Sequence, residues 1–361
     1  MTPISITAVG LASSLGGIIQ AAAAFRAGIT RAQNLPWITA HGHDGERALV
    51  VGHPVRPPVE GLDGFAAWLR LAQLAWADGW TTGGASSARY PNDWSGTGMI
   101  LVMPRIHLAR HGWEVDDPGS LLDEHLLLAL LSRLGIVLPD THRVVIAGDH
   151  SGTAQALGVA SARLAAGDWR RAVILAIDSL LDPSSITWLA ENARLKGEGN
   201  PNGIQPGESA VVLVVESSDV ATCGSVRGVT VVSSAHLPGD DGAPRPDPIR
   251  IATRWSTLMQ QDETLREAQC EHVLDQTGEE WRALSWGHLL SRSSLGRGSQ
   301  RVRLPAESFG ATGAASGALG CALALRAFQR GYAKARDALV WSVDDVGSVG
   351  LIHLRNQTVT A

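Results

Sequence analysis

The chain has 361 residues, 45% of them hydrophobic and 18% charged, and its formal net charge is −5. A chain of this length and composition can bury a sizeable core, either as two domains or as one large α/β domain. The slight excess of acidic residues argues against a nucleic-acid-binding protein, because such proteins usually carry a basic stripe.

The first half of the chain predicts strands and helices in alternation. Short apolar runs indicate buried strands, and apolar residues at helical spacing indicate amphipathic helices. Residues 34–60 are rich in Pro and His and are expected to form loops. The predicted strands cover residues 5–9, 98–103, 143–147, 172–177 and 210–216, and the predicted helices cover residues 18–27, 65–78, 121–134 and 153–166.

The second half repeats this plan in a shorter form. Residues 236–248 are rich in Pro, Asp and Gly and are expected to form a surface loop. Two successive β/α halves, residues 1–220 and 221–361, with helices inside and outside, predict an α/β fold of five layers, α/β/α/β/α. The predicted strands cover residues 226–234, 271–274, 338–343 and 348–354, and the predicted helices cover residues 255–269, 279–292 and 314–330.

The cysteines and histidines provide no frame for a disulfide scaffold or a metal site. Cys223, Cys270 and Cys321 are widely spaced and form no CxxC pair, and the cluster at residues 41–44 (His-Gly-His-Asp) is expected to be a solvated loop. We therefore expect no metal and no cofactor. The N-terminus lacks the basic region of a signal peptide, and no apolar run reaches about 18 residues, so we expect a cytoplasmic protein without a membrane span.

Four motifs follow one another along nearly the whole chain. They are Ile6–Gly16 with Ala24–Gly28, Ala147–Gly152 with Gly167–Ile174, Asn202–Glu216, and Phe309–Gly317. In order and rough spacing they resemble four motifs of the β-ketoacyl synthase branch of the thiolase superfamily. These are its first strand and helix, its nucleophile elbow, its "dGf.pGEgA.vlvLE" segment and its "fGH..aAAG" segment. The resemblance implies a thiolase-like fold made of two related halves.

The resemblance does not extend to the residue that makes such proteins enzymes. A ketosynthase carries its acyl group on a cysteine thiolate at the elbow, where the helix N-terminus lowers the pKa of the thiol. Aligning Ser151-Gly152 with the family's elbow puts Asp149 in place of that cysteine, and a slip of one residue puts His150 there. Neither side chain can carry an acyl group as a thiolate does, and we expect Asp149 to cap the following helix.

The two histidines that act on the thioester carbonyl in ketosynthases are replaced as well. Asp275 stands where the family has its HGTG motif, and Ala311 stands where the family has its second histidine. Loss of all three groups together implies a retained fold without ketosynthase chemistry. Two alternatives stay open. Asp149 and Asp275 could form a carboxylate pair, and His150 with Ser151 could act as a Ser–His pair, although adjacent residues at a helix start point apart.

The sequence is rich in tryptophan, with 12 Trp against 2 Tyr and 4 Phe. Trp281 and Trp286 both fall in the predicted helix at residues 279–292. We expect them to pack that helix onto the sheet, with a substrate mouth or a partner surface as the alternative.

The resemblance implies a protein partner and three classes of function. Family members pair through the strand before the elbow, here residues 143–147, which implies a homodimer or a heterodimer with a related subunit. The first class is a non-catalytic binding, adaptor or chaperone protein, since degenerate proteins of this kind resemble ones encoded beside type VI secretion effectors. The second is a chain-length-factor-like inactive partner of an active ketosynthase, which would meet an acyl carrier protein in fatty acid or polyketide-type synthesis. The third is a divergent acyltransferase of the 3-oxoacyl-ACP synthase type. No nucleic-acid or membrane partner is expected.

Overall fold

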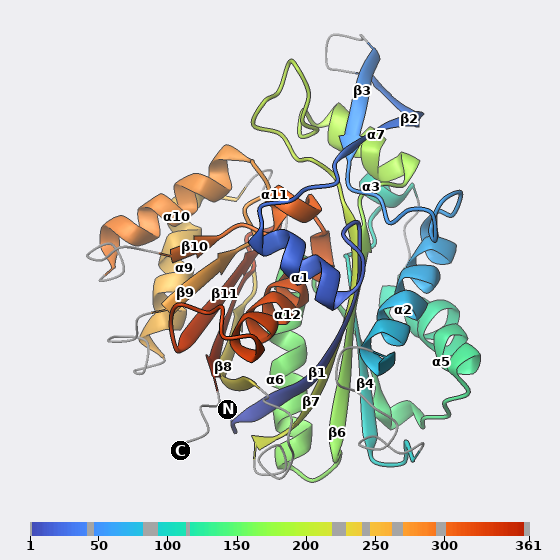
Figure 1. The fold of residues 1–361 in the computed structure, drawn as a ribbon, viewed down its shortest axis with the longest axis vertical. Coiled ribbons are helices and arrows are strands. Elements are labelled where there is room, and N and C mark those ends of the chain that lie inside the picture. The colour runs from blue at the N-terminus through green and yellow to red at the C-terminus, as the bar shows by residue number, and fades with distance from the viewer. Residues whose placement is uncertain are drawn as a thin grey trace.

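Ten strands of the computed structural model join in one mixed sheet, and two more form a hairpin (Figure 1). The structure describes residues 2–41, 47–81, 93–112, 116–218, 229–239, 246–261, 270–293 and 301–356. The sheet and the helices packed on it position every group discussed below.

One side of the sheet is built by the first half of the chain. Its strands are β1 (Ile4–Ser13), β4 (Thr97–Met103), β5 (Arg143–Ala147), β6 (Arg171–Ser179) and β7 (Glu208–Ser217). From the edge inward the order is β5-β4-β6-β7-β1; β4 is parallel to β5 and β6, and β7 is antiparallel to β6 and β1. Every residue of β1, β4 and β6 is buried. Strands covered on both faces carry continuous apolar runs, as the sequences of β4 and β6 do.

The second half builds the other side with the same pattern. Its strands are β8 (Val229–Leu237), β9 (Cys270–Leu274), β10 (Arg301–Arg303), β11 (Asp337–Val343) and β12 (Val349–Asn356). From the other edge the order is β10-β9-β11-β12-β8, with β9 parallel to both neighbours and β12 antiparallel to both of its own. The two sides meet where Ile4–Ile6 of β1 pairs with Val229–Val231 of β8. The predicted division at residue 220 falls within residues 219–228, outside the described part, and stays a prediction.

Helices form the other three layers, as the sequence predicts. Helices α6 (Gly152–Ala165) and α12 (Ser316–Gln329) each contact strands of both halves and lie between them. Helix α2 (Gly64–Thr81) covers the outer face of the first half, and α9 (Pro248–Gln260) with α10 (Glu280–Arg292) covers that of the second (Figure 1). The fold is therefore the five-layered α/β/α/β/α arrangement.

The central position of α12 explains its content of Gly and Ala. Ten of its 14 residues are buried, because sheet strands and other helices surround it. A Cβ atom on Gly320 would lie 2.7 Å from Cγ1 of Val340 in β11, closer than side chains tolerate. A small residue is thus required where the helix crosses the sheet.

The main differences from the sequence prediction concern the segment 34–60, helix α7 (Pro183–Glu191) and the predicted helix at 121–134. Residues 34–60 are predicted as loops, but most of the hairpin of β2 (Gln33–His41) and β3 (Arg47–Gly52) lies there. Its buried Leu35 and Val50 pack against α7 and against Leu181, which precedes that helix. Helix α7 is absent from the prediction, although Asp182 caps it by accepting a hydrogen bond from Ser185 N and Pro183 occupies its first turn. The predicted helix at 121–134 is divided between α4 (Pro118–Leu122), a π-helical turn (Asp123–Leu127) and α5 (Leu128–Leu134).

The short helices α1 (Ile18–Arg26), α3 (Leu108–His111) and α11 (Ala306–Phe309) complete the described elements used below. Trp281 and Trp286 pack against the core of the second half, as predicted; the ring of Trp286 lies 5.4 Å from that of Trp341 in β11. None of the helices in the described segments combines the length and hydropathy that crossing a bilayer requires.

Candidate functional site: the elbow between β5 and α6

The chain turns sharply between strand β5 and helix α6. Asp149 lies in this turn with φ of 44°, a left-handed conformation that costs a non-glycine residue about 1–2 kcal/mol. The glycines on either side permit the turn, since a Cβ on Gly148 would lie 2.6 Å from Cα of Gly152. A strained strand–turn–helix segment of this kind is the geometry of a nucleophile elbow.

The carboxylate of Asp149 is bound by Arg105, in the segment after β4. The backbone N–H of Arg105 donates a hydrogen bond to Oδ1 of Asp149 at 2.9 Å, and the guanidinium Nε lies 3.4 Å from Oδ2. The predicted role as a cap of α6 is wrong, because the hydrogen bond that the carboxylate accepts comes from Arg105 and α6 begins without a side-chain cap. Burial raises the pKa of Asp149 to about 7, and the neighbouring carboxylate of Asp344 adds to the rise.

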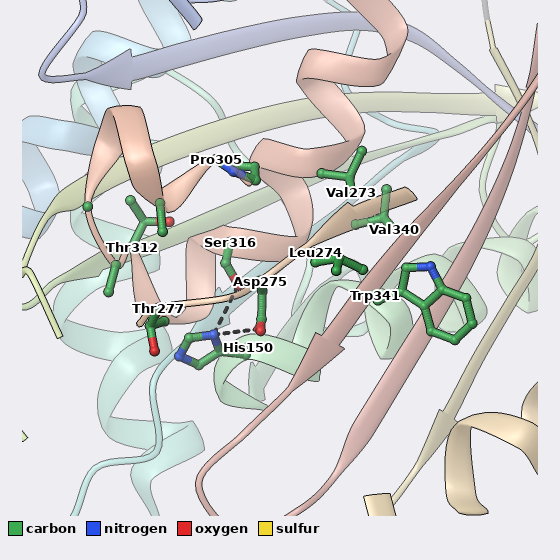
Figure 2. A pocket seen from close by; sticks show the side chains of 13 residues that line it. His150, Val273, Leu274, Asp275, Thr277, Pro305, Thr312, Ser316, Val340 and Trp341 are labelled. Atoms are coloured by element: carbon green, nitrogen blue, oxygen red, sulfur yellow. Dashed lines mark hydrogen bonds and ion pairs between the residues drawn. The ribbon is translucent and has the colours of Figure 1, made fainter. Parts of the chain in front are cut away.

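His150 turns instead toward the second half of the chain. Its Nδ1 lies 2.7 Å from Oδ2 of Asp275 and 3.2 Å from Oγ of Ser316. Dashed lines mark both contacts in Figure 2. The other oxygen of Asp275, Oδ1, accepts a hydrogen bond from Nη1 of Arg282 at 2.7 Å. The side chain of Arg282 is 1% exposed and that of Asp275 is 6% exposed. His150, Asp275 and Arg282 therefore form one buried chain of polar contacts.

These contacts exclude both alternatives that the sequence leaves open. Asp149 and Asp275 do not form a carboxylate pair, because Arg105 binds the first while His150 and Arg282 bind the second. A Ser–His–Asp relay needs the serine and the aspartate on different ring nitrogens, whereas Ser316 and Asp275 both face Nδ1 of His150. The hydroxyl of Ser151 donates a hydrogen bond to the carbonyl of Gly148 at 3.1 Å and not to His150.

A small cavity adjoins His150 and Asp275, and we call it the elbow cavity. Thr277, Gly310, Ala311, Ser316 and Trp341 are among its other lining residues, and its volume is about 20 Å³. A cavity of this size holds about one water molecule. Ala311 contributes only a methyl group beside its backbone, whose N–H donates to the carbonyl of Gln205 at 2.8 Å. The structure thus brings together three of the sequence-predicted positions, His150, Asp275 and Ala311, while Asp149 faces Arg105.

A second set of charges joins the two halves near this cavity. Arg194, in the segment after α7, binds Glu279 at 2.8 Å and Asp345 at 2.6 Å. Asp345 also lies 3.5 Å from Nη2 of Arg282, and these cations hold the pKa of Asp345 far below its usual range. Arg105 likewise bridges Asp149 to Asp344 at 3.3 Å. The elbow is therefore surrounded by ion pairs that involve both halves of the chain.

Sequence reasoning missed the arginines of this network. They come from three segments far apart in the chain, at Arg105, Arg194 and Arg282. Nothing in the sequence around each one distinguishes it from an ordinary surface arginine. The position of Arg105 in the sequence is the one available signal for its contact with the elbow. Arg105 follows β4 and the elbow follows β5, and because these strands are parallel their carboxyl ends lie at the same end of the sheet. That placement alone does not identify the carboxylate it binds.

No cysteine in the described residues replaces the missing thiol. Cys270 and Cys321 are buried, and burial raises the pKa of Cys321 to about 12, which keeps the thiol protonated and unreactive. Cys223 and most of the cluster at residues 41–44 lie outside the described residues. Within the described segments, no group of three or more His, Cys, Asp or Glu side chains is arranged to hold a metal ion.

Comparison with known proteins gives matches only at the level of structure. No protein-family model and no curated protein matches the chain. A β-ketoacyl synthase from Burkholderia phymatum STM815 superposes with a TM-score of 0.73 at 15% identity, covering 99% of this chain and 100% of that chain. The ishigamide ketosynthase/chain length factor has a TM-score of 0.69 at 20% identity, with 99% of each chain covered.

A further match is the AntDE:AntF structure, a type II PKS acyl-carrier protein in complex with its ketosynthase bound to the hexaketide. It has a TM-score of 0.76 at 13% identity and covers 99% of this chain and 100% of that chain. Identities this low carry information about the fold alone. The chain has the thiolase-like fold of the β-ketoacyl synthases and chain length factors, as its four sequence motifs imply.

Proposed function

We propose that this protein is a non-catalytic, cytoplasmic subunit with the β-ketoacyl synthase fold that acts by binding another protein. The observation that carries the proposal is the bond between Asp149 and Arg105 at the tip of the elbow. Where a ketosynthase needs a free thiolate, this chain has a carboxylate held in an ion pair.

The surroundings of the elbow support the same conclusion. Acyl transfer needs a nucleophile, donors for the developing oxyanion and space for the acyl group. Asp275 is bound by Arg282, Ala311 has no side-chain donor, and the elbow cavity has room for about one water molecule. These features support a scaffold, because an acyl-enzyme intermediate would need a free nucleophile, free donors and more space.

The exposed edge of the sheet supports a protein partner. Strand β5 is the last strand on its side, and all five of its residues are half-buried rather than buried. An edge strand offers unpaired backbone groups to another strand. Pairing of β5 with a second copy or with a related subunit would extend the sheet across the interface.

Within this class we favour an adaptor or chaperone, with handling of a type VI secretion effector as the specific case that the sequence resemblance suggests. A second candidate is an inactive partner of an active ketosynthase. Its support is that a ketosynthase/chain length factor and a ketosynthase in complex with its acyl-carrier protein are both among the structures that match over nearly the whole chain.

Purification of the tagged full-length chain with its bound proteins distinguishes these candidates. The captured proteins are identified by mass spectrometry, and each complex is rebuilt from purified components and its stoichiometry measured by light scattering. An adaptor forms a defined complex with an unrelated protein and none with an acyl carrier protein. A chain-length-factor-like subunit forms a heterodimer with a cysteine-containing homologue. Acyl transfer onto the chain itself would contradict both.

A further inference from the structure

A second, much larger cavity lies away from the elbow. It is open to solvent on one side and lined by the segment 54–63, the hairpin strand β2 and the start of α7, and its volume is about 400 Å³. Figure 1 shows β2, β3 and α7 together at one end of the molecule. The cavity shares no lining residue with the elbow cavity. Its volume is within the range of about 300–1,000 Å³ that is typical of small-molecule sites.

Most of the cavity wall is apolar. Its apolar side chains are those of Ile38, Pro54, Val55, Val59, Leu62, Leu181 and Pro183. Leu62 is 43% exposed at the rim, whereas Val59 is buried. A ligand for this cavity therefore has an apolar body that the wall can cover.

Glu208, the first residue of β7, supplies a buried charge to this wall. It is 5% exposed, and its carboxylate accepts hydrogen bonds from Val55 N at 2.7 Å and from Ser179 Oγ at 3.0 Å. No lysine, arginine or histidine of the described segments forms an ion pair with it. Buried carboxylates are almost always paired with a cation, and the two hydrogen bonds of Glu208 do not supply one.

The remaining charged residues of the wall give the cavity a negative balance. Arg56 is the single cation among them, and its guanidinium lies 3.3 Å from the carboxylate of Glu60. Burial raises the pKa of Glu208, and the charge of Arg56 opposes that rise. Glu60, Asp63 and Glu208 are the three acidic residues. The cavity therefore favours a positively charged ligand over an anionic one.

From this geometry we infer that the cavity binds a small organic cation, an alkylammonium with an apolar body whose charged group pairs with Glu208. The alkyl part lies against the side chains of Val59 and Leu181, and the ammonium group donates to the free lone pairs of the Glu208 carboxylate. This binding site is independent of the proposed function, because it uses neither the elbow nor the β5 edge.

Titration calorimetry on the full-length protein with three six-carbon probes tests the inference. We expect n-hexylammonium to bind and hexanoate to show no binding. The affinity for neutral hexan-1-ol should be lower than that for hexylammonium by about tenfold or more. Glu208→Gln removes the charge; its amide oxygen can still accept from Val55 N, and its NH2 group can donate to Ser179 Oγ instead of accepting from it. This change should weaken hexylammonium binding about tenfold or more. Val59→Phe narrows the cavity and should weaken the ammonium and the alcohol together.

Glu191→Gln is the matched control, because it removes one exposed carboxylate from α7 without touching the cavity. It should leave hexylammonium affinity unchanged, and the melting temperatures of all variants verify that they fold. Equal affinities of the wild-type protein for hexylammonium and hexan-1-ol would overturn the inference. So would unchanged hexylammonium affinity in Glu208→Gln, or no binding of hexylammonium at all.

Discussion

The guanidinium of Arg282 lies 2.7 Å from the carboxylate of Asp275, and both side chains are almost fully buried, at 1% and 6% exposure. Asp275 begins the segment after β9 and Arg282 lies in α10, so their contact fastens an outer helix to the sheet beside the elbow. Arg282 also donates to the carbonyl of Val343 at 2.7 Å, at the end of β11. The position at which the sequence resemblance implies a lost histidine is thus part of the structural core.

Replacing Arg282 with Met should strongly destabilise the protein. The change leaves Asp275 as a buried carboxylate without its main counter-charge, a change that costs about 3–5 kcal/mol. Urea denaturation followed by tryptophan fluorescence measures the loss. Arg163→Met is the control, because Arg163 pairs with Asp168 on the surface, at 48% and 46% exposure, and should change stability by less than about 1 kcal/mol. Equal effects of the two substitutions would contradict the assigned role of the buried pair.

Replacing Asp149 with Asn should stabilise the protein in a pH-dependent manner. The pKa of Asp149 is raised from its ordinary value of 3.8 to about 7, so the folded state favours the protonated form. Its stability therefore falls as the pH rises from about 4 to 7, and the full penalty applies above pH 7. Asn has no charge to desolvate and tolerates the left-handed backbone conformation.

We expect Asp149→Asn to raise the free energy of unfolding at pH 8 by about 1–3 kcal/mol, which allows for the partial exposure of the side chain. The gain should shrink to near zero at pH 4, where the wild-type carboxylate is largely protonated when folded. Melting temperatures measured from pH 4 to pH 8 provide the comparison, with Asp168→Asn as the surface control. A loss of stability at pH 8 would show that the ion pair with Arg105 outweighs the cost of burial.

A positive charge on the β5 edge should disrupt the proposed subunit pairing. Val144→Lys places an ammonium group on a strand that we expect to pair with its counterpart, so that charges on the two subunits repel each other in a homodimer. Light scattering after size-exclusion chromatography should give a dimer for the wild type and a monomer for this variant. Val302→Lys, at an exposed position of the opposite edge strand β10, is the control and should remain dimeric. A wild-type monomer at high concentration would remove the expectation.

The sequence predicts those parts of the fold that depend on local patterns. Buried strands such as β4 and β6 appear as apolar runs, and the spacing of Gly148 and Gly152 marks the elbow because a tight turn needs small residues there. The hairpin of β2 and β3 is missed because its Pro and His content resembles a loop, while its strand conformation depends on packing near α7. The π-helical turn at Asp123–Leu127 is missed because its sequence is as apolar as an ordinary helix.

The candidate site is predicted only in part, for a similar reason. Asp149, Asp275 and Ala311 are found because each occupies a recognisable motif. The partners of the two carboxylates, Arg105 and Arg282, have no motif, and only the folded chain brings them into contact. The carboxylate pair does not form because each acid binds an arginine instead, and spacing in the sequence does not reveal those contacts.

The central claim is that this fold has lost the chemistry of acyl transfer, and intact-protein mass spectrometry tests it most directly. The purified full-length chain is incubated with acyl-CoA and with acyl-loaded carrier protein as donors, and its mass is recorded before and after the reaction. We expect no acyl adduct on the wild type or on the variants Asp149→Ala, His150→Ala and Ser151→Ala. A stable adduct on the wild type that disappears in one of these variants would contradict it and restore the chain to the acyl-transferring enzymes.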